Sequence, residues 1–278
     1  MEANVWSEVL KQYDMLGVDD VLPIAHVRIR SDIGILLDDY GNFMAATINR
    51  KDRCSIPCTI DSESRTSGDY PHPIHDNMSY ICSDYPEYQK RHQLYMSQLK
   101  RYIDAVDDIL AKSVYRYLQK STIRLDVEPL LKQITDIPEK KIMITFATIG
   151  HRSTTSEEWT KYYISTLPQN GICAITGEPD YVPEKYPKGI RSSVDQAKLF
   201  ISNANRLDSM PVLAPGYIAS QKIIHTLQFI IYEGDSWAYS LLRDNPDISD
   251  EWKKWIKSYE IKMRLYTSKS KGEQNDRS

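Results

Sequence analysis

Two short apolar segments on either side of a tight-turn sequence constrain the fold most strongly. Residues 33–37 and 43–48 flank Asp39-Tyr40-Gly41-Asn42. Gly and Asn tolerate the positive φ angles that hairpin turns require. The pattern therefore predicts an antiparallel hairpin in the first third of the chain, and residues 25–30 predict a further short strand.

A helical pattern follows the hairpin. Over residues 87–120, apolar residues recur at spacings of three and four, and Pro86 fits the start of a helix. The pattern also accommodates a break within this span. The apolar positions are Leu99, Ile103, Val106, Leu110, Val114 and Tyr117.

The rest of the chain adds strands and helices. Residues 141–148, 172–176 and 197–202 predict strands, and residues 216–232 predict a helix. Residues 251–266 predict a basic helix that carries Trp252 and Trp255. These elements together indicate an α+β fold, with mixed or antiparallel sheets and packed helices.

The expected domain organisation has two regions and a tail. Residues 1–130 hold the hairpin, a loop and the long helix, and residues 131–267 form a second α+β region. The second region forms its own unit or extends the first, with Pro129 and Pro138 interrupting the pattern between them. Residues 268–278 are polar, and we expect them to be disordered.

Composition excludes several protein classes. Of the 278 residues, 41% are hydrophobic and 26% are charged, as in globular proteins and unlike collagen-like or disordered chains. No apolar run approaches the roughly 18 to 20 residues of a membrane span. The first eleven residues do not resemble a signal peptide. We therefore expect a cytoplasmic protein whose four cysteines are reduced thiols.

Charge and tyrosine content leave two interpretations open. The net charge of −3 argues weakly against nucleic-acid binding, yet residues 87–124 carry eight Lys and Arg against four Asp and Glu. Ordinary solvated helix faces explain the same pattern. The chain has 19 Tyr and only 4 Phe, and tyrosine suits wet interfaces more than dry cores.

Catalytic motifs are weak throughout. The sequence lacks a Walker A loop, GxGxxG, HExxH and GxSxG, so we expect no enzyme activity and no cofactor. One alternative is a zinc site built from Cys54, Cys58, His72 and His75, although C-x3-C is an unusual spacing for zinc. Cys173 as a nucleophile is a second alternative, but its apolar neighbours favour a buried strand residue.

Two irregular segments concentrate groups that hydrogen-bond phosphates or base edges. The first, residues 56–80, contains Arg65, Thr66, Ser67 and Asn77. The second, residues 173–205, is a Pro- and Gly-rich connection punctuated by cationic and amide side chains. Turn formation and helix capping explain both segments equally well. The polar residues of the second are Lys185, Lys188, Arg191, Lys198, Asn203 and Asn205.

These segments, in this order, resemble the large subunit of the type I-C CRISPR Cascade complex over most of residues 4–239. The first looks like that family's Arg-Thr-Ser-Gly stretch, followed by Pro-His-Pro and an Asp-Asn before a Tyr. The helix 88–120 is similar to the next block of the family. The later matching motifs are Cys173 to Gly177, Tyr186-Pro187-Lys188, 197–203 (AKLFISN) and Ser220-Gln221-Lys222.

The resemblance implies a non-catalytic DNA-recognition subunit in antiviral defence. Such a subunit reads the protospacer-adjacent motif (PAM) and helps R-loop formation, while a separate nuclease cuts. Its implied partners are the other Cascade subunits, CRISPR RNA at the 5′-handle end and target double-stranded DNA, with no membrane or small-molecule partner. Arg65, Thr66, Ser67 and Asn77 are expected to face the motif. Lys185, Lys188, Arg191 and Lys198 are expected to contact phosphates, and Asn203 and Asn205 to do either or to cap a turn.

Two departures from the family leave another reading open. Residues 205–215 (NRLDSMPVLAP) lack the aromatic, glycine-rich basic stretch that usually follows the Ser-Asn segment. The chain also has about half the family's length and lacks its helical C-terminal part. The alternative is therefore a truncated or repurposed homologue that acts as a protein-interaction module or as an inhibitor of Cascade.

Overall fold

The computed structural model describes residues 5–16, 21–50, 53–63, 65, 67–151, 153–187, 199–200 and 214–244. The fold is α+β, with mixed and antiparallel sheets, as predicted. The predicted helix 251–266 and the polar tail lie outside the described residues, and the predicted strand 197–202 lies largely outside them.

A four-stranded sheet with the order β3-β2-β6-β5 forms the centre of the molecule. The predicted hairpin is confirmed, because β2 (Ile33–Leu37) pairs antiparallel with β3 (Phe43–Ile48). Gly41 adopts a φ of 79°, and the Asp38 carboxylate accepts the N–H groups of Tyr40 and Asn42, which holds the turn. On the other side, β6 (Met143–Thr148) lies parallel to β2, and the short β5 (Asp76–Asn77) completes the sheet.

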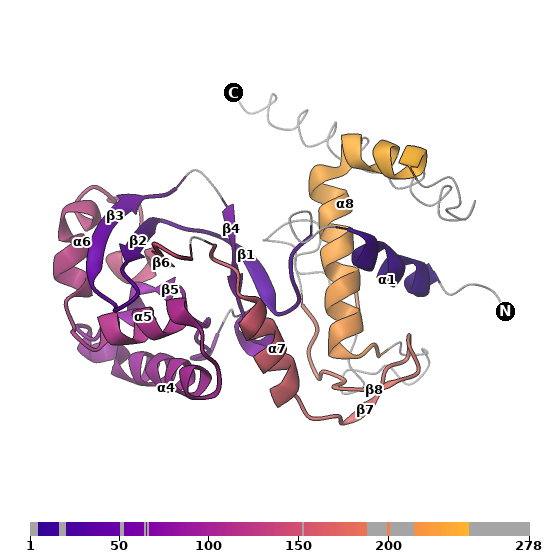
Figure 1. The fold of residues 1–278 in the computed structure, drawn as a ribbon, viewed down its shortest axis with the longest axis horizontal. Coiled ribbons are helices and arrows are strands. Elements are labelled where there is room, and N and C mark those ends of the chain that lie inside the picture. The colour runs from indigo at the N-terminus through magenta and orange to yellow at the C-terminus, as the bar shows by residue number, and fades with distance from the viewer. Residues whose placement is uncertain are drawn as a thin grey trace.

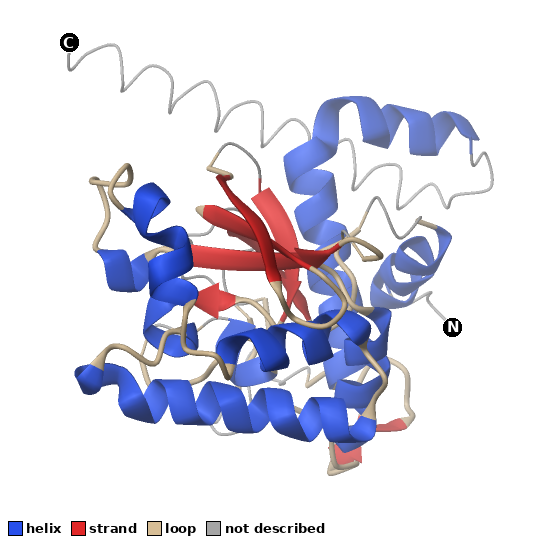
Figure 2. Cartoon of the chain, turned by 60° about the vertical axis from the view of Figure 1, so that its left-hand side comes forward, coloured by secondary structure: helices blue, strands red, loops and turns tan. Residues whose placement is uncertain are grey.

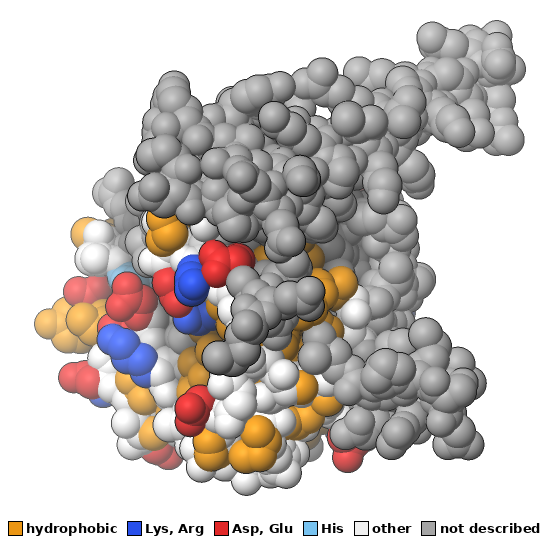
Figure 3. Space-filling model, turned by 90° about the vertical axis from the view of Figure 1, so that its right-hand side faces the viewer, with side chains coloured by type: hydrophobic (Ala, Val, Ile, Leu, Met, Phe, Trp, Pro, Cys, Tyr) orange, Lys and Arg blue, Asp and Glu red, His pale blue; other side chains and the backbone are white. Residues whose placement is uncertain are grey.

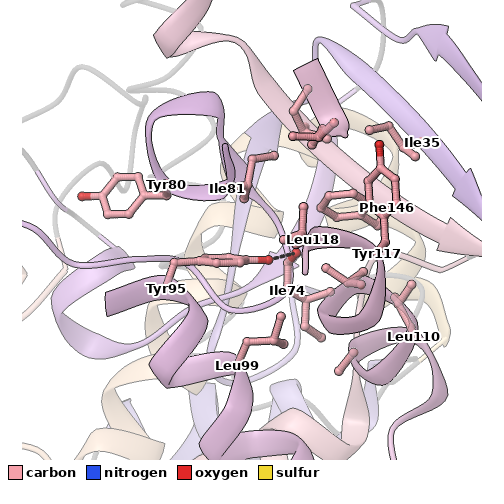
Figure 4. Packing of buried hydrophobic residues seen from close by; sticks show 14 of the residues in the cluster. Ile35, Ile74, Tyr80, Ile81, Tyr95, Leu99, Leu110, Tyr117, Leu118 and Phe146 are labelled. Carbon is pink, nitrogen blue, oxygen red and sulfur yellow. Dashed lines mark hydrogen bonds between the residues drawn. The ribbon is translucent and has the colours of Figure 1, made fainter. Parts of the chain in front are cut away.

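Helices α4 (Gln89–Ala105) and α5 (Ile109–Leu118) cover one face of this sheet, as Figures 1 and 2 show. The predicted helix 87–120 is therefore two helices, with a 3-10 turn η1 (Pro86–Tyr88) before them. Ile33, Ile35 and Phe146 from the sheet pack with apolar residues of both helices in the main core. Figure 4 shows this packing, with the Tyr95 hydroxyl donating to the carbonyl of Ile74 at 2.7 Å.

Shorter elements complete this half of the molecule. Helix α3 (Met78–Ile81) follows β5, and α6 (Ile123–Leu131) contacts β3. Pro129, one of the two prolines expected to interrupt the pattern, lies inside α6. A 3-10 turn, η2 (Glu139–Lys141), leads into β6.

A two-stranded sheet connects the central sheet to the rest of the chain. Strand β1 (His26–Arg30) pairs antiparallel with β4 (Arg53–Pro57), and α2 (Ile60–Glu63) follows. Helix α7 (Glu157–Thr166) packs nearby, because the buried Trp159 donates from Nε1 to the carbonyl of Cys58 at 3.1 Å.

A second, smaller core joins the two ends of the described chain. Helix α1 (Val5–Met15) packs along α8 (Tyr217–Asp244), as Figure 1 shows. Val9, Tyr186, Phe200 and Ile223 lie in this core. The predicted helix 216–232 is thus the first part of a longer helix.

The predicted strand 172–176 is wrong beyond its first residue. Strand β7 (Gly171–Ile172) pairs with β8 (Pro179–Asp180), and between them the chain turns. The N–H of Gly177 donates to the carbonyl of Cys173 at 2.9 Å, and Gly177 adopts a φ of 76°. The Cys173 side chain is buried at this turn, and its sulfur accepts the N–H of Thr176 at 3.5 Å.

The two regions expected from the sequence share one sheet and one core. Strand β6, which follows residue 130, lies between β2 and β5, which precede it. In the described part of the chain, no helix combines the length and the apolar character that crossing a bilayer requires.

Candidate nucleic-acid interface

The loop between β4 and β5 carries the first group of predicted site residues. At its start, the Thr59 hydroxyl accepts the N–H of Ser62 at 3.1 Å, and the Ser62 hydroxyl accepts the N–H of Thr59 at 2.8 Å. These reciprocal bonds form the single turn of α2. The loop then returns to the core at Asp76, which is fully buried.

Arg65 and Asp76 form a bidentate ion pair that closes this loop. The Nη1 and Nη2 atoms of Arg65 donate to the two carboxylate oxygens of Asp76 at 2.8 and 2.5 Å, and Nη1 also donates to the Tyr70 carbonyl at 2.7 Å. Asp76 accepts the N–H groups of His72 and Asn77 as well. The Arg65 side chain is only 17% exposed, so its guanidinium fixes the loop and a base contact would require breaking the ion pair.

Tyrosine rings and cationic groups alternate beside this loop. The Arg65 guanidinium lies 4.4 Å from the centre of the Tyr80 ring, and that of Arg91 lies 5.3 Å from the same ring. Arg91 also lies 5.0 Å from the centre of the Tyr88 ring, and the Lys140 ammonium lies 5.2 Å from it. We call these five residues the cation–tyrosine row.

Five separate segments supply the row, namely the β4–β5 loop, α3, η1, α4 and η2. Asp69 partly compensates the positive charge of the row. Arg91 Nε donates to the Asp69 carboxylate at 2.8 Å, and the Lys90 ammonium lies 3.5 Å from the same carboxylate. The hydrogen bond from Arg91 holds the pKa of Asp69 below its usual value. Lys90 and Lys140 remain exposed, so the outer edge of the row presents positive charge.

Asn77 begins helix α3 next to the row. Its Oδ1 accepts the N–H of Ser79 at 3.1 Å and the Ser79 hydroxyl at 2.6 Å, which caps the helix. Arg91 Nη1 donates to the same hydroxyl oxygen at 3.3 Å. Among the described residues, no hydrogen-bond acceptor contacts Asn77 Nδ2, and the side chain is half-buried. The Asn77 amide group therefore lies beside Arg91, with its oxygen committed to the cap of α3.

Of the other predicted site residues, two are described by the structure and six lie outside the described residues. Ser67 and Lys185 are exposed, which fits a surface role. Thr66, Lys188, Arg191, Lys198, Asn203 and Asn205 lie outside the described residues. Tyr186, next to Lys185, is a core residue whose hydroxyl donates to the Pro215 carbonyl at 2.7 Å. The structure thus brings Arg65, Ser67 and Asn77 into one loop region and does not place most of the second group.

The four residues of the zinc alternative do not form a metal site. In the described part of the chain, no three His, Cys, Asp or Glu side chains come together as metal ligands. His75 uses both ring nitrogens within the core, because Nδ1 accepts the N–H of Phe146 at 3.1 Å and Nε2 lies 3.2 Å from the Thr154 carbonyl. Cys58 is fully buried, and burial raises the pKa of its thiol.

Tyr80, Tyr88, Arg91 and Lys140 were missing from the predicted site. Arg91 belongs to the basic segment 87–124, and the excess of Tyr over Phe suited wet interfaces, but neither observation singled out these residues. Tyr80 is only 2% exposed and belongs to the main core. The formal net charge of the chain is −3, so the protein carries no overall positive charge. In the described part of the face in Figure 3, Lys and Arg side chains lie beside Asp and Glu.

The model of the family described as CRISPR-associated protein (Cas_Csd1) matches residues 9–211. This match includes the β4–β5 loop and the whole cation–tyrosine row. No curated protein matches the sequence.

Proposed function

Since this chain belongs to the CRISPR-associated protein (Cas_Csd1) family, we propose that it is the DNA-recognition large subunit of a type I-C Cascade complex. In this proposal the protein is not catalytic. It reads the PAM, helps R-loop formation and works with the other Cascade subunits and CRISPR RNA. Guide pairing then supplies the sequence specificity, so the protein needs only a few polar contacts to a short duplex.

The observation that carries the proposal is the position of Asn77 beside the cation–tyrosine row. The amide donors of Asn77 can discriminate base edges, and Ser67 lies exposed in the same loop. Lys90 and Lys140 are assigned to backbone phosphates, which need charge more than geometry. Arg65 is assigned to positioning, because Asp76 already binds its guanidinium.

The remaining predicted residues keep the roles that the resemblance implies. Lys185, Lys188, Arg191 and Lys198 are proposed to contact phosphates, Thr66 to face the motif, and Asn203 and Asn205 to bind DNA or cap a turn. A protein with a net charge of −3 can serve this purpose, because the affinity for DNA is shared across the assembly.

The decisive experiment measures binding of the assembled complex to duplexes that differ only in the flanking motif. Asn77→Ser keeps a helix-capping oxygen and removes the amide donors. We expect discrimination between motifs to fall by about tenfold, with a small loss of affinity for the best motif. Asn49→Ser, on a half-buried asparagine at the end of β3, is the matched control. Equal weakening on every duplex by Asn77→Ser would remove Asn77 from motif reading.

The phosphate assignment has its own test. Lys140→Ala should weaken binding to all duplexes and lower the slope of log affinity against log salt by about one. Lys132→Ala removes another exposed lysine, one paired with Glu128 on α6, and should leave both quantities unchanged. An unchanged salt slope for Lys140→Ala argues that the row faces away from DNA.

A further inference from the structure

A cavity lies far from the cation–tyrosine row, where α1, the end of α7, the β7–β8 turn and the start of α8 meet. Its volume is about 430 Å³, within the range of roughly 300 to 1,000 Å³ that ligand sites occupy. Figure 1 shows α1 beside α8, β7 and β8 below it, and α7 on its other side. None of the described residues assigned to DNA contact lines it.

The inner wall of this cavity is apolar. Leu10 of α1, Leu167 after α7 and Ile218 of α8 contribute aliphatic side chains to it. All three are only partly buried, so they present apolar surface to whatever enters. An aliphatic chain that covers them would gain free energy in proportion to the apolar area removed from water.

The rim of the cavity is acidic. Asp14, Glu178 and Asp180 line it, and Lys222 is the only cationic side chain in the lining. Lys222 already pairs with Asp14, since Nζ lies 2.5 Å from Oδ1. Within the described part of the chain, neither Glu178 nor Asp180 has an ion-pair partner. Among the described residues, the lining therefore holds three carboxylates and one cationic side chain, next to an apolar wall.

Backbone contacts fix the position of Asp180. Its Oδ1 accepts the N–H of Tyr181 at 2.7 Å, and the carbonyl of Tyr181 accepts the N–H of Tyr217 at 2.7 Å, which joins β8 to α8. A Cβ atom on Gly216 would lie 2.0 Å from Asp180 Oδ2, so the absence of a side chain at position 216 lets the carboxylate approach the start of α8. The Asp180 carboxylate is therefore held in place at the start of α8.

We propose that this cavity is a docking site for a basic, amphipathic segment of a partner protein. A lysine or arginine of that segment binds Glu178 and Asp180, and its aliphatic stem and apolar neighbours cover Leu10, Leu167 and Ile218. Long cationic side chains bury their stems on apolar surface while the charged end stays in water. A charge-assisted hydrogen bond to a fixed carboxylate supplies the specificity. This inference goes beyond the proposed function and does not depend on DNA recognition.

The first test uses the full chain and a fluorescent synthetic peptide in which arginines alternate with pairs of leucines, measured by anisotropy. Glu178→Lys reverses an exposed charge at the rim, and we expect it to weaken binding at least tenfold. Glu184→Lys makes the same change at an exposed acid outside the cavity and should alter binding less than twofold. Equal weakening by both variants means nonspecific charge attraction and overturns the proposal. Unchanged affinity for a peptide with glutamine in place of arginine also overturns it.

The second test identifies the occupant in the assembled complex. A photo-crosslinking amino acid at Gln169, which lines the cavity, should label a partner segment that contains lysine or arginine beside apolar residues. The Glu178→Lys change should reduce that crosslink. Full competition of the peptide by spermidine would show that the cavity takes small organic cations, and no crosslink to any subunit would show that it holds no protein segment. Either result overturns the proposal.

Discussion

Asp76 is the residue on which the conformation of the β4–β5 loop depends. Its buried carboxylate accepts hydrogen bonds from Arg65 and from two backbone N–H groups. Asp76→Asn leaves the guanidinium of Arg65 without an anion, and we expect a loss of about 3 kcal/mol in the free energy of unfolding. Urea denaturation measures this loss. Asp104→Asn breaks an exposed ion pair with Lys100 and should cost under about 0.5 kcal/mol, so similar losses for the two variants contradict the role of Asp76.

Single residues of the candidate interface were predictable only in part. Arg65 and Asn77 were found because polar groups cluster in an irregular segment. Their different roles were not predictable from the sequence, because only the structure shows that Arg65 pairs with the buried Asp76. Tyr80, Tyr88 and Lys140 come from three different elements, and no spacing in the sequence links them. Tertiary packing alone creates the row.

At the scale of elements, the break between α4 and α5 is the most informative difference from the sequence pattern. Apolar spacing continues through Val106, so hydrophobic periodicity alone does not reveal it. Asp108 determines where α5 begins, because its Oδ1 accepts the N–H of Ala111 at 2.9 Å and caps the helix. The other oxygen, Oδ2, accepts the hydroxyls of Tyr102 at 2.7 Å and Ser156 at 3.0 Å, which ties α4 and α7 to the same carboxylate.

Removing this carboxylate should have a large effect on stability. Asp108→Ala removes the cap of α5 and the carboxylate that accepts both the Tyr102 and Ser156 hydroxyls, which can then bond only to each other, so we expect a loss of about 3 kcal/mol. Asp107→Ala is the control, since that neighbouring side chain is 88% exposed and makes only a surface ion pair with Lys112. Thermal unfolding monitored by circular dichroism compares the two. A control as destabilised as Asp108→Ala would show that the connection itself, and not the cap, matters.

Other elements differ in how far local sequence determines them. The hairpin and β6 were predictable because turn residues and apolar runs specify them locally. Strand β5 has only two residues and exists because β6 lies beside it. Strand β7 ends at Ile172 because Cys173 begins a turn. In that turn the N–H of Thr176 donates to the Cys173 sulfur, and the N–H of Gly177 donates to the Cys173 carbonyl. Local patterns therefore predict the long elements and miss those formed by their neighbours.

At the scale of the whole molecule, non-local pairing unites the two expected regions. Ile33 pairs with Ile144, and no local pattern indicates that these strands lie side by side. The described part of the chain holds four fully or almost fully buried histidines. Burial lowers the pKa of His26 and His72 to about 4 and of His75 and His225 to about 3. These side chains are neutral in the folded protein and become charged on unfolding in mild acid.

This arrangement predicts a steep loss of stability on acidification. The unfolded chain, with histidine pKa values of about 6.5, binds more protons than the folded chain between about pH 6.5 and 4. The stabilisation is fully present above pH 6.5 and is lost as the pH falls through that window. Near pH 5 we expect these four histidines to take up nearly four protons on unfolding, or roughly 5 kcal/mol per pH unit. Calorimetry in buffers of different ionisation enthalpy counts these protons, and an unfolding free energy that stays constant from pH 7 to 5 contradicts the prediction.

Glu63 should lower the stability of the folded protein at alkaline pH. Burial raises its pKa to about 8, and the Gln221 amide that donates to it at 3.0 Å only partly compensates. Because the folded pKa lies above the unfolded value of about 4.5, stability from the protonated acid is full below pH 4.5 and is lost as the pH rises to 8. Among the described residues, Gln221 Oε1 is buried without a hydrogen-bond partner. Gln221 Nε2 faces both Glu63 oxygens, so the amide of Glu63→Gln can accept from Nε2, or donate to Oε1 once the Gln221 amide turns over. We therefore expect Glu63→Gln to raise the midpoint of urea unfolding at pH 8.5 and to remove the alkaline decline. Asp61→Asn, at an exposed carboxylate of the same α2 turn, is the control and should leave that decline in place. A Glu63→Gln variant that is less stable than the parent at pH 8.5 would show that a partner holds the Glu63 carboxylate ionised.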